Sequence, residues 1–402
     1  MRTVRARLLA VVSAAALLAA PLASADLAGA ESKPKRAKAI TVMSRNIYLG
    51  ADINRPVAAA QQALASCQDP ETCPQEVLFA LAGATHQTRQ IVDQTNFPAR
   101  ATLLADEIAR TQPDLIGLQE VALWRSGPIE LAEENILRPN ATQVDYDFLK
   151  LLLKALRAEG VRYKIAEEGL RADVEAPSFS ESPFEEGAQD VRMTMRDVIL
   201  VRADSAFEVT GTGDEIYDQN LVVDLSGKQM SFDRGYNWVN VRSGDKRLRF
   251  VNSHFEAFSS DIAHAQAQQL LAEAVAPKRT TIFVCDCNSD PLNDNVKEEI
   301  GDTLPHKAPY DLIVGEGGFT DQWLELASGG PGWTSGLSET VDDETAAGFD
   351  HRIDMIFART PDGTPLRVRG GEVTGDELAD RDPVTGLWPS DHAGVVLRLR
   401  GY

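Results

Sequence analysis

Several short segments of this chain are continuously apolar, and a polar residue closes most of them. Short apolar runs of this kind are typical of strands buried on both faces of a sheet. The pattern predicts strands at residues 39–49, 114–121, 163–166, 196–201, 221–225, 237–241, 248–254, 280–285, 352–358 and 393–399. Apolar residues at helical spacing predict helices at 97–110, 145–159 and 261–276, and within an Ala- and Gln-rich segment at 51–95. Strands and helices alternate, which indicates an α/β arrangement of stacked sheets and helices.

The segments between these elements are expected to be loops. Gly-Pro and Pro-Asn steps predict a loop excursion at 124–147, and acidic residues with two prolines predict a mobile surface loop at 170–190. Residues 211–213 are expected to form a turn, and residues 290–350 are Gly-rich and irregular. No internal repeat and no linker divides the chain, so we expect one domain over 39–402, with insertions near 51–95 and 290–350.

The first residues have the features of an export signal. Arg2, Arg5 and Arg7 precede an apolar run at 8–22 and a small-residue cleavage site at 23–25. We therefore predict a signal peptide at 1–25, cleavage near Ala25, a flexible N-terminus at 26–38 and a secreted protein. No other stretch is long and apolar enough to span a bilayer, so no stable membrane insertion is expected.

The charge balance bears on possible partners. The chain has 60 acidic and 40 basic residues and a net charge of −20. This excess opposes loose binding to nucleic acid and to anionic membranes. The sequence also shows no cluster of Lys and Arg that would form a track for a polyanion.

The four cysteines form two close pairs. Cys67 and Cys73 bracket a turn-like loop, and export permits disulfides, so a bridge between them is predicted. Cys285 and Cys287 alternate along an apparent buried strand. We interpret them as two small buried hydrophobic residues, with a disulfide as the alternative.

Polar residues recur where the predicted strands begin or end. These residues are Asn46, Glu120, His254, Asp286, Asn288, Asp354, Asp391 and His392. Each has a structural explanation when taken alone. Asn46 could cap a turn, Glu120 could pair with a surface lysine, and Asp354 could pair with Arg352. Together they are the oxygen and imidazole groups needed for metal-assisted hydrolysis.

Six short motifs carry these residues in a fixed order between about residues 41 and 400. They are Ser44-Arg45-Asn46-Ile47, a Gln-Glu step within 114–121, Asn252-Ser253-His254, Asp286-Cys287-Asn288-Ser289, Arg352-Ile353-Asp354 and Ser390-Asp391-His392. In this order they resemble the endonuclease/exonuclease/phosphatase (DNase I-like) superfamily, in a secreted bacterial-type member. The resemblance implies a four-layer α/β sandwich of two packed mixed β-sheets flanked by helices. Arg45 stands where many members carry an aromatic residue, and Cys285 where a glycine is common.

The resemblance also implies roles for these residues. Asn46, Glu120 and Asp391 would hold a divalent cation, with Mg²⁺ expected and Mn²⁺ or Ca²⁺ as alternatives. The catalytic set would be His254, Asp286, Asn288, Asp354 and His392, with Asp354 orienting His392. Either Asp286 or His392 could take the proton of the attacking water.

Two further residues are considered as substrate contacts. Arg234 precedes a strand and could reach a phosphate, although a structural turn would also account for it. His351 lies beside the Asp354 motif and could line the cleft or cap a strand end.

The expected function is metal-dependent phosphoester hydrolysis by direct attack of water on phosphorus. The acidic composition favours a small or lipid-derived phosphoester, as for a sphingomyelinase or phospholipase C. A DNase I-like secreted endonuclease acting on nucleic acid is the alternative, and a non-catalytic binding protein with this fold is a third hypothesis. No obligate protein partner is inferred.

Overall fold

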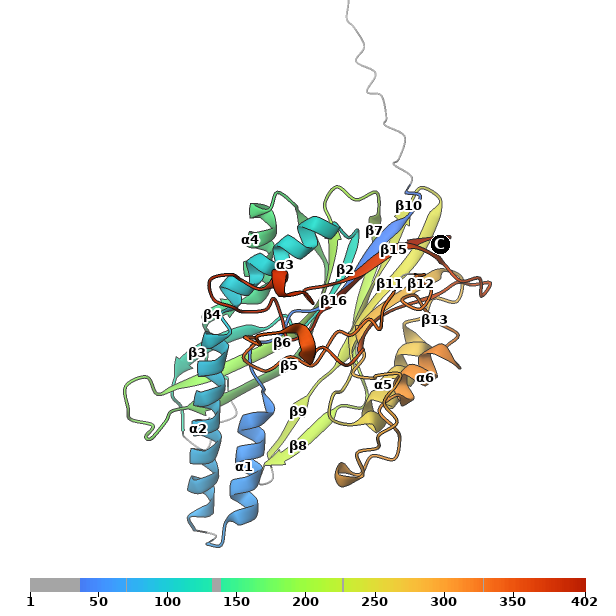
Figure 1. Ribbon diagram of the computed structural model, residues 1–402. Helices are drawn as coiled ribbons and strands as arrows, with labels where there is room; N and C mark the ends of the chain where they lie inside the picture. Colours follow the sequence, from blue (N-terminus) through green and yellow to red (C-terminus); the bar gives the residue numbers. More distant parts are fainter. Residues whose placement is uncertain (1–36, 70, 132–138, 226–227, 328) are drawn as a thin grey trace, which may run out of the picture. The chain divides into compact units, whose positions relative to one another are not determined.

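The computed structural model describes residues 37–402, except 70, 132–138, 226–227 and 328. The predicted signal peptide and all but the last two residues of the predicted flexible N-terminus lie outside this range. Two mixed β-sheets form the centre of the described chain (Figure 1). The predicted α/β sandwich is confirmed.

The first sheet has eight strands in the order β15-β16-β1-β2-β6-β3-β4, with β5 paired to β6. Their bounds are β1 Ile40–Asn46, β2 Leu115–Gln119, β3 Leu123–Pro128, β4 Gln143–Asp147, β5 Tyr163–Ser178, β6 Gln189–Arg202, β15 Arg367–Thr374 and β16 Gly394–Arg400. β1 lies between β16, its antiparallel neighbour, and β2, its parallel neighbour. Strands from both ends of the described chain therefore lie side by side at the centre of this sheet.

The second sheet has six strands in the order β13-β14-β12-β11-β10-β7. Their bounds are β7 Glu208–Ile216, β10 Gly235–Ser243, β11 Lys246–His254, β12 Thr280–Asp286, β13 Thr320–Asp321 and β14 Asp354–Arg359. A separate hairpin joins β8 Leu221–Leu225 to β9 Lys228–Phe232. β11 and β12 run parallel, so His254 and Asp286 are register partners at the ends of their strands.

Six α-helices belong to the described residues. They are α1 Asn54–Ser66, α2 Cys73–Gln94, α3 Phe97–Thr111, α4 Phe148–Ala158, α5 Ser260–Glu273 and α6 Ala308–Val314. No helix in the described ranges combines the length and hydrophobicity that crossing a bilayer would require.

The core has three main apolar layers. The facing sides of the two sheets pack on each other through residues such as Val42, Leu397 and Ile282. The outer face of the first sheet packs on α3 and α4, as at Leu104 and Leu152. The outer face of the second sheet packs on α5 and α6. Helix, sheet, sheet and helix therefore form the four predicted layers (Figure 1).

The segment at 51–95 is confirmed as helical and interrupted at Cys67. It forms the helices α1 and α2, and a disulfide joins Cys67 to Cys73 at the connection between them. Residues 290–350 are mostly irregular, as expected, but they also include α6 and the short strand β13.

Two predicted loops include strand residues in the structure. Residues 124–128 and 143–147 belong to β3 and β4, and residues 170–178 and 189–190 belong to the long pair β5 and β6. The acidic residues of this pair are compatible with a sheet because basic neighbours face them across the strands. Asp173, for example, forms ion pairs with Arg125 and Arg192.

Two other expectations are wrong. Residues 211–213 lie within β7 rather than in a turn, and a glycine is needed at 213 because a Cβ atom there would lie 2.6 Å from the Trp238 ring. Cys285, on β12, and Cys287, just after this strand, are joined by a disulfide, with their Cα atoms 5.0 Å apart. In addition, β15 was not predicted.

Candidate active site

The polar residues predicted from the strand ends meet at one end of the two packed sheets. Asn46 and Asp286 end β1 and β12, His254 ends β11, and Asp354 begins β14. A cavity of about 320 Å³ opens here. Among its lining residues are Glu120, His254, Asp286, Asn288, Asp391 and His392. Asn46 and Asp354 are buried and hydrogen-bond to members of this set.

His392 is held by Asp354. Nδ1 of His392 lies 2.8 Å from Oδ2 of Asp354, and both side chains are buried. Burial alone would lower the pKa of His392, but the carboxylates of Asp354, Asp286 and Asp391 together raise it well above the ordinary value. These carboxylates favour the charged form of His392, and the bond at Nδ1 leaves Nε2 to serve as the second donor.

The surroundings of His254 favour its neutral form instead. Arg234 donates a hydrogen bond from a terminal guanidinium nitrogen to Nδ1 of His254 at 2.8 Å. Because a guanidinium can only donate, Nδ1 must be the unprotonated nitrogen and Nε2 must carry the proton. Burial, followed by the charge of Arg234, lowers the pKa of His254 well below its ordinary value. A neutral imidazole therefore directs an N–H group toward Asp286, whose Oδ2 lies 3.4 Å away.

Asp286 is the centre of the cluster. Its Oδ2 accepts a hydrogen bond from Nδ2 of Asn46 at 2.9 Å, and its Oδ1 accepts one from the backbone amide of Asn288 at 3.1 Å. Burial raises the pKa of Asp286 to about 7, with further contributions from the charges of Asp354 and Glu120, while the charge of His392 opposes the rise. A carboxyl group with a pKa near neutrality is suited to general acid–base catalysis.

The carboxylates of the site fit a divalent cation. One ligand atom each from Glu120, His254 and Asp286 lie within 4.8 Å of one another, but Nδ1 of His254 is bonded to Arg234 and its Nε2 carries the proton, so the carboxylates are the ligands available in this group. Burial raises the pKa of Asp391 to about 6, and the charge of Glu120 adds to the effect although His392 opposes it. The carboxylates of Glu120, Asp286 and Asp391 line the same cavity. Hard cations such as Mg²⁺ prefer this set of oxygen donors.

Asp286, Asp354 and His392 also lie close enough together to hold a metal ion. Here Nδ1 of His392 is already bonded to Asp354, which favours a hydrogen-bonded triad over metal coordination. We therefore place the cation on the Glu120 side of the cavity.

Two buried arginines support the site and were not predicted as functional residues. Arg45 pairs with buried Glu107 at 3.0 Å and donates a hydrogen bond to the backbone carbonyl of His392. Arg100 donates hydrogen bonds to the backbone carbonyls of Ile47 and Pro389, both at 3.0 Å. Both arginines therefore connect the end of β1 to the segment that carries Asp391 and His392. The only sequence signal is the position of Arg45 beside Asn46.

The two insertions meet at the rim of the cavity. Arg55 of α1 forms an ion pair with Glu339 of the 290–350 segment. The backbone carbonyl of Glu339 accepts a hydrogen bond from the Tyr48 hydroxyl at 2.7 Å. Tyr48 and Glu339 both line the cavity, so residues outside the catalytic set form part of its wall.

The two predicted substrate contacts, Arg234 and His351, differ in burial and in their position relative to the cavity. Arg234 is buried, lines the cavity and binds His254, so it reaches the site through that histidine. His351 is exposed, pairs with Asp350 and is not among the residues that line the cavity. Its backbone bridges to Ser335, which also bridges to His392.

The second disulfide joins the two residues on either side of Asp286. Cys285 and Cys287 flank this residue and are fully buried against α5 and α6. Their bond closes a small ring around the Asp286 backbone, which restricts the main chain that carries the carboxylate.

Comparison with known proteins supports the fold. Neither a scan with protein-family models nor a search of curated proteins found a match to the chain. Among solved structures, an endonuclease/exonuclease/phosphatase from Beutenbergia cavernae DSM 12333 is 17% identical, covers 90% of this chain and 72% of its own, and has a TM-score of 0.50. A family protein from Bacteroides thetaiotaomicron is 16% identical over 90% of this chain and 94% of its own, with a TM-score of 0.47. The mannosyl-6-phosphatase of Bacteroides thetaiotaomicron VPI-5482 is 15% identical over 90% of this chain and 99% of its own, with a TM-score of 0.46. At such identities, the likeness to the Beutenbergia protein establishes a shared fold.

Proposed function

We propose that this chain is a secreted, divalent-metal-dependent phosphoester hydrolase in which an activated water attacks phosphorus directly. The observation that carries the proposal is the geometry around Asp286, where His254, bonded to Arg234, and His392, bonded to Asp354, both lie within 4 Å of its Oδ2. A phosphoester is anionic and repels a nucleophile, so its hydrolysis requires both donors for the phosphoryl oxygens and a base for the water.

Glu120 and Asp391, with Asn46, would hold the cation, for which Mg²⁺ is proposed and Mn²⁺ or Ca²⁺ are alternatives. When bound, the cation neutralises charge on the phosphoryl oxygens. The backbone amide of Leu49 fixes the Glu120 carboxylate by a hydrogen bond to Oε2 of 2.8 Å. Ser390 supports Asp391 through a hydrogen bond of 3.3 Å to Oδ1.

The proton-acceptor, donor and positioning roles belong to side chains of the cavity. Asp286 accepts the proton of the attacking water, because its pKa of about 7 lets it ionise near neutrality and take a proton back. His392 is proposed to donate from Nε2 to the phosphoryl oxygens. The Nε2–H of His254, which lies 3.4 Å from Oδ2 of Asp286, and the second N–H of the Asn288 amide, whose Nδ2 also donates to the backbone carbonyl of Phe255, are proposed as further donors. Asp354 acts through His392 by holding its Nδ1.

The cavity walls favour a small or lipid-derived phosphoester as the substrate. Apolar side chains line the cavity beside the catalytic set, namely Leu49, Ile53, Met195, Phe232 and Phe258. Arg234 is the only Lys or Arg in the described lining, and it is bonded to His254, while Asp52, Glu256 and Glu339 add negative charge. A nucleic acid needs several cations to neutralise successive phosphates, and the cavity does not supply them.

The proposal is tested with bis(p-nitrophenyl) phosphate and Mg²⁺. His392→Ala and Asp286→Ala should each lower turnover by about 10²- to 10⁴-fold, the usual contribution of a positioned acid or base. His264→Ala on α5, outside the cavity lining, is the control and should retain wild-type turnover. EDTA should abolish activity, and added Mg²⁺ or Mn²⁺ should restore it.

Substrate class is decided by parallel assays of sphingomyelin, glycerophosphodiesters, inositol phosphates and plasmid DNA. Efficient nicking of plasmid would replace the lipid assignment with a nuclease. Absence of turnover on the whole panel, together with tight metal-independent ligand binding, would support the non-catalytic alternative.

A further inference from the structure

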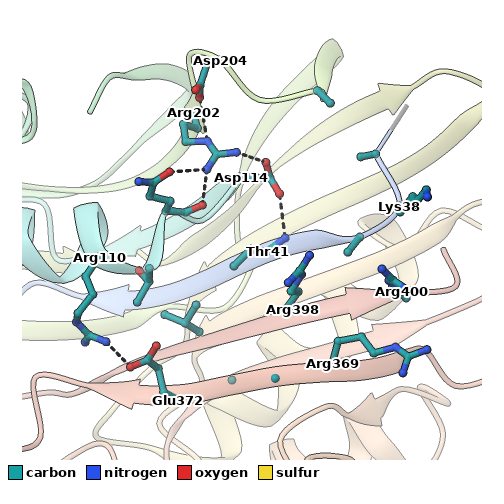
Figure 2. A pocket seen from close by; sticks show the side chains of 18 residues that line it. Lys38, Thr41, Arg110, Asp114, Arg202, Asp204, Arg369, Glu372, Arg398 and Arg400 are labelled. Carbon is teal, nitrogen blue, oxygen red and sulfur yellow. Dashed lines mark hydrogen bonds and ion pairs between the residues drawn. The ribbon is translucent and has the colours of Figure 1, made fainter. Parts of the chain in front are cut away.

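A second cavity of the described chain lies away from the catalytic groups. It has a volume of about 730 Å³ and lies where β1 begins, β6 and β16 end, and α3 stops at Thr111 (Figure 2). Thr41 lines this cavity, and Asn46 of the catalytic cluster lies five residues further along β1. At about 3.3 Å per residue, Thr41 is about 17 Å from Asn46 along the strand, and no residue lines both cavities. The cavity is therefore separate from the catalytic pocket.

Its floor is the outer face of the first sheet beyond the end of the helix layer. On β16, Val395, Leu397 and Leu399 point into the core between the sheets. Arg398 and Arg400 alternate with them, so the two arginine side chains lie on the opposite face of the sheet, about 7 Å apart along the strand. Arg369 joins them from β15, at a bulge where the register with β16 shifts.

Cations dominate the lining. Six basic side chains and three carboxylates surround the cavity, and the basic residues are Lys38, Arg110, Arg202, Arg369, Arg398 and Arg400. They come from five separate places in the sequence, so folding creates a cluster in a chain whose net charge is −20.

The three carboxylates are already engaged. Glu372 pairs with Arg110, and Asp114 and Asp204 both pair with Arg202 at 3.0 Å. Figure 2 shows these pairs as dashed lines and shows none reaching the other four cations.

The remaining cations have no acidic partner. Among the described residues, no carboxylate lies within ion-pair distance of Lys38, Arg369, Arg398 or Arg400. The Nε atom of Arg400 is buried without a hydrogen-bond partner. In addition, Arg367 is the register partner of Arg400 on β15. Like charges directly opposite each other are destabilising, so a multivalent anion would relieve this repulsion.

We propose that this cavity is a binding site for an oligophosphate, meaning two or more linked phosphoryl groups, whether free or part of a polymer. Arginine dominates the unpaired cations, and its planar fork matches the geometry of phosphate oxygens. Several unpaired cations in one open cavity fit several linked negative charges better than a single phosphate. The site is independent of the hydrolytic function proposed above and serves to recruit or retain the protein on such a polyanion.

The test is isothermal titration of the full-length chain with tripolyphosphate in EDTA, at low salt, where no divalent cation bridges the ligand to the catalytic carboxylates. Wild type should bind saturably, and Arg398→Gln/Arg400→Gln should weaken binding at least tenfold. The matched control is Lys154→Gln/Arg157→Gln on α4, which removes the same charge from exposed positions outside the cavity. The control should bind within twofold of wild type. Circular dichroism and thermal unfolding establish that both double variants are folded.

Three further arms identify the ligand class. Orthophosphate should bind at least tenfold more weakly than tripolyphosphate, and citrate should also bind more weakly. Equal binding of citrate would overturn the phosphate assignment. Absence of saturable binding, or equal loss in the control variant, would overturn the site itself. If the chain ignores tripolyphosphate but sediments with phosphatidylglycerol vesicles, the surface is a membrane contact and the oligophosphate proposal is wrong.

Discussion

Asp354→Asn tests the proposed chemistry most directly, because it replaces a carboxylate by a group of the same shape. In the wild type, Asp354 accepts from Nδ1 of His392 at 2.8 Å and helps to keep the imidazole charged. The neutral amide no longer stabilises the imidazolium. It can also donate to Nδ1, which would force the other tautomer of the ring.

The size of the effect follows from the burial of both partners. A carboxylate in contact with a histidine raises its pKa by about 1–3 units, and each unit corresponds to about 1.4 kcal/mol. The variant should therefore lower the pKa of His392 by that amount. It should lower kcat/KM by about 10²- to 10⁴-fold if His392 acts as the donor. The raised pKa of His392 stabilises the fold fully below its unfolded value of about 6.5 and loses this contribution as the pH rises through the folded value. The stability deficit of the variant should accordingly be largest at mildly acidic pH.

The assay combines a pH–rate profile with an NMR titration of the histidine ring signals, assigned with a His392→Gln variant. Asp350→Asn is the matched control, because Asp350 pairs with the exposed His351 outside the cavity. The control should leave kcat/KM unchanged. If the Asp354 variant kept both wild-type activity and an unshifted His392 titration, the proposed role of the pair would be wrong.

Three other results are expected. Arg234→Met removes the donor that fixes the tautomer of His254, so it should lower kcat/KM by about 10- to 100-fold without loss of fold. Unchanged kinetics would refute this positioning role. Mg²⁺ affinity, measured by calorimetry, should increase as the pH rises through 6, because Asp391 must lose a proton whose pKa is about 6; a pH-independent affinity would contradict Asp391 as a ligand. Glu107→Gln leaves the buried charge of Arg45 uncompensated and should lower the free energy of unfolding by about 3–5 kcal/mol in urea denaturation. A loss below about 1 kcal/mol would show that the pair is not important for stability.

The strand-end pattern was sufficient to bring most of the site together. Parallel neighbours such as β1 with β2 end at the same edge of a sheet, so Asn46 and Glu120 had to be close once the strands were identified. The order of the six motifs added the pairing of Asp354 with His392, which the structure shows at 2.8 Å. These features depend on local patterns and on their order along the chain.

Contacts between distant segments could not be predicted in this way. Arg100 binds main-chain carbonyls at both Ile47 and Pro389, and a carbonyl carries no sequence signature. The parts of β5 and β6 within 170–190 were predicted to be a loop because their acidic residues suggested solvent, whereas cross-strand arginines neutralise Asp173. The basic cavity at the other end of the sheet was missed for the same reason, since its cations come together only after folding.

The central position of β1 has a consequence for the order in which the molecule can be completed. Ile40 pairs with Leu399, so β1, near the start of the described chain, can complete its pairing only when β16, near its end, is present. Contacts of such large sequence separation form late and slowly, because the intervening chain must be ordered first. Until residues 391–400 have been synthesised and have docked beside β1, the first sheet remains split and the pocket lacks both Asp391 and His392. During synthesis the candidate site therefore stays incomplete until β16 pairs with β1.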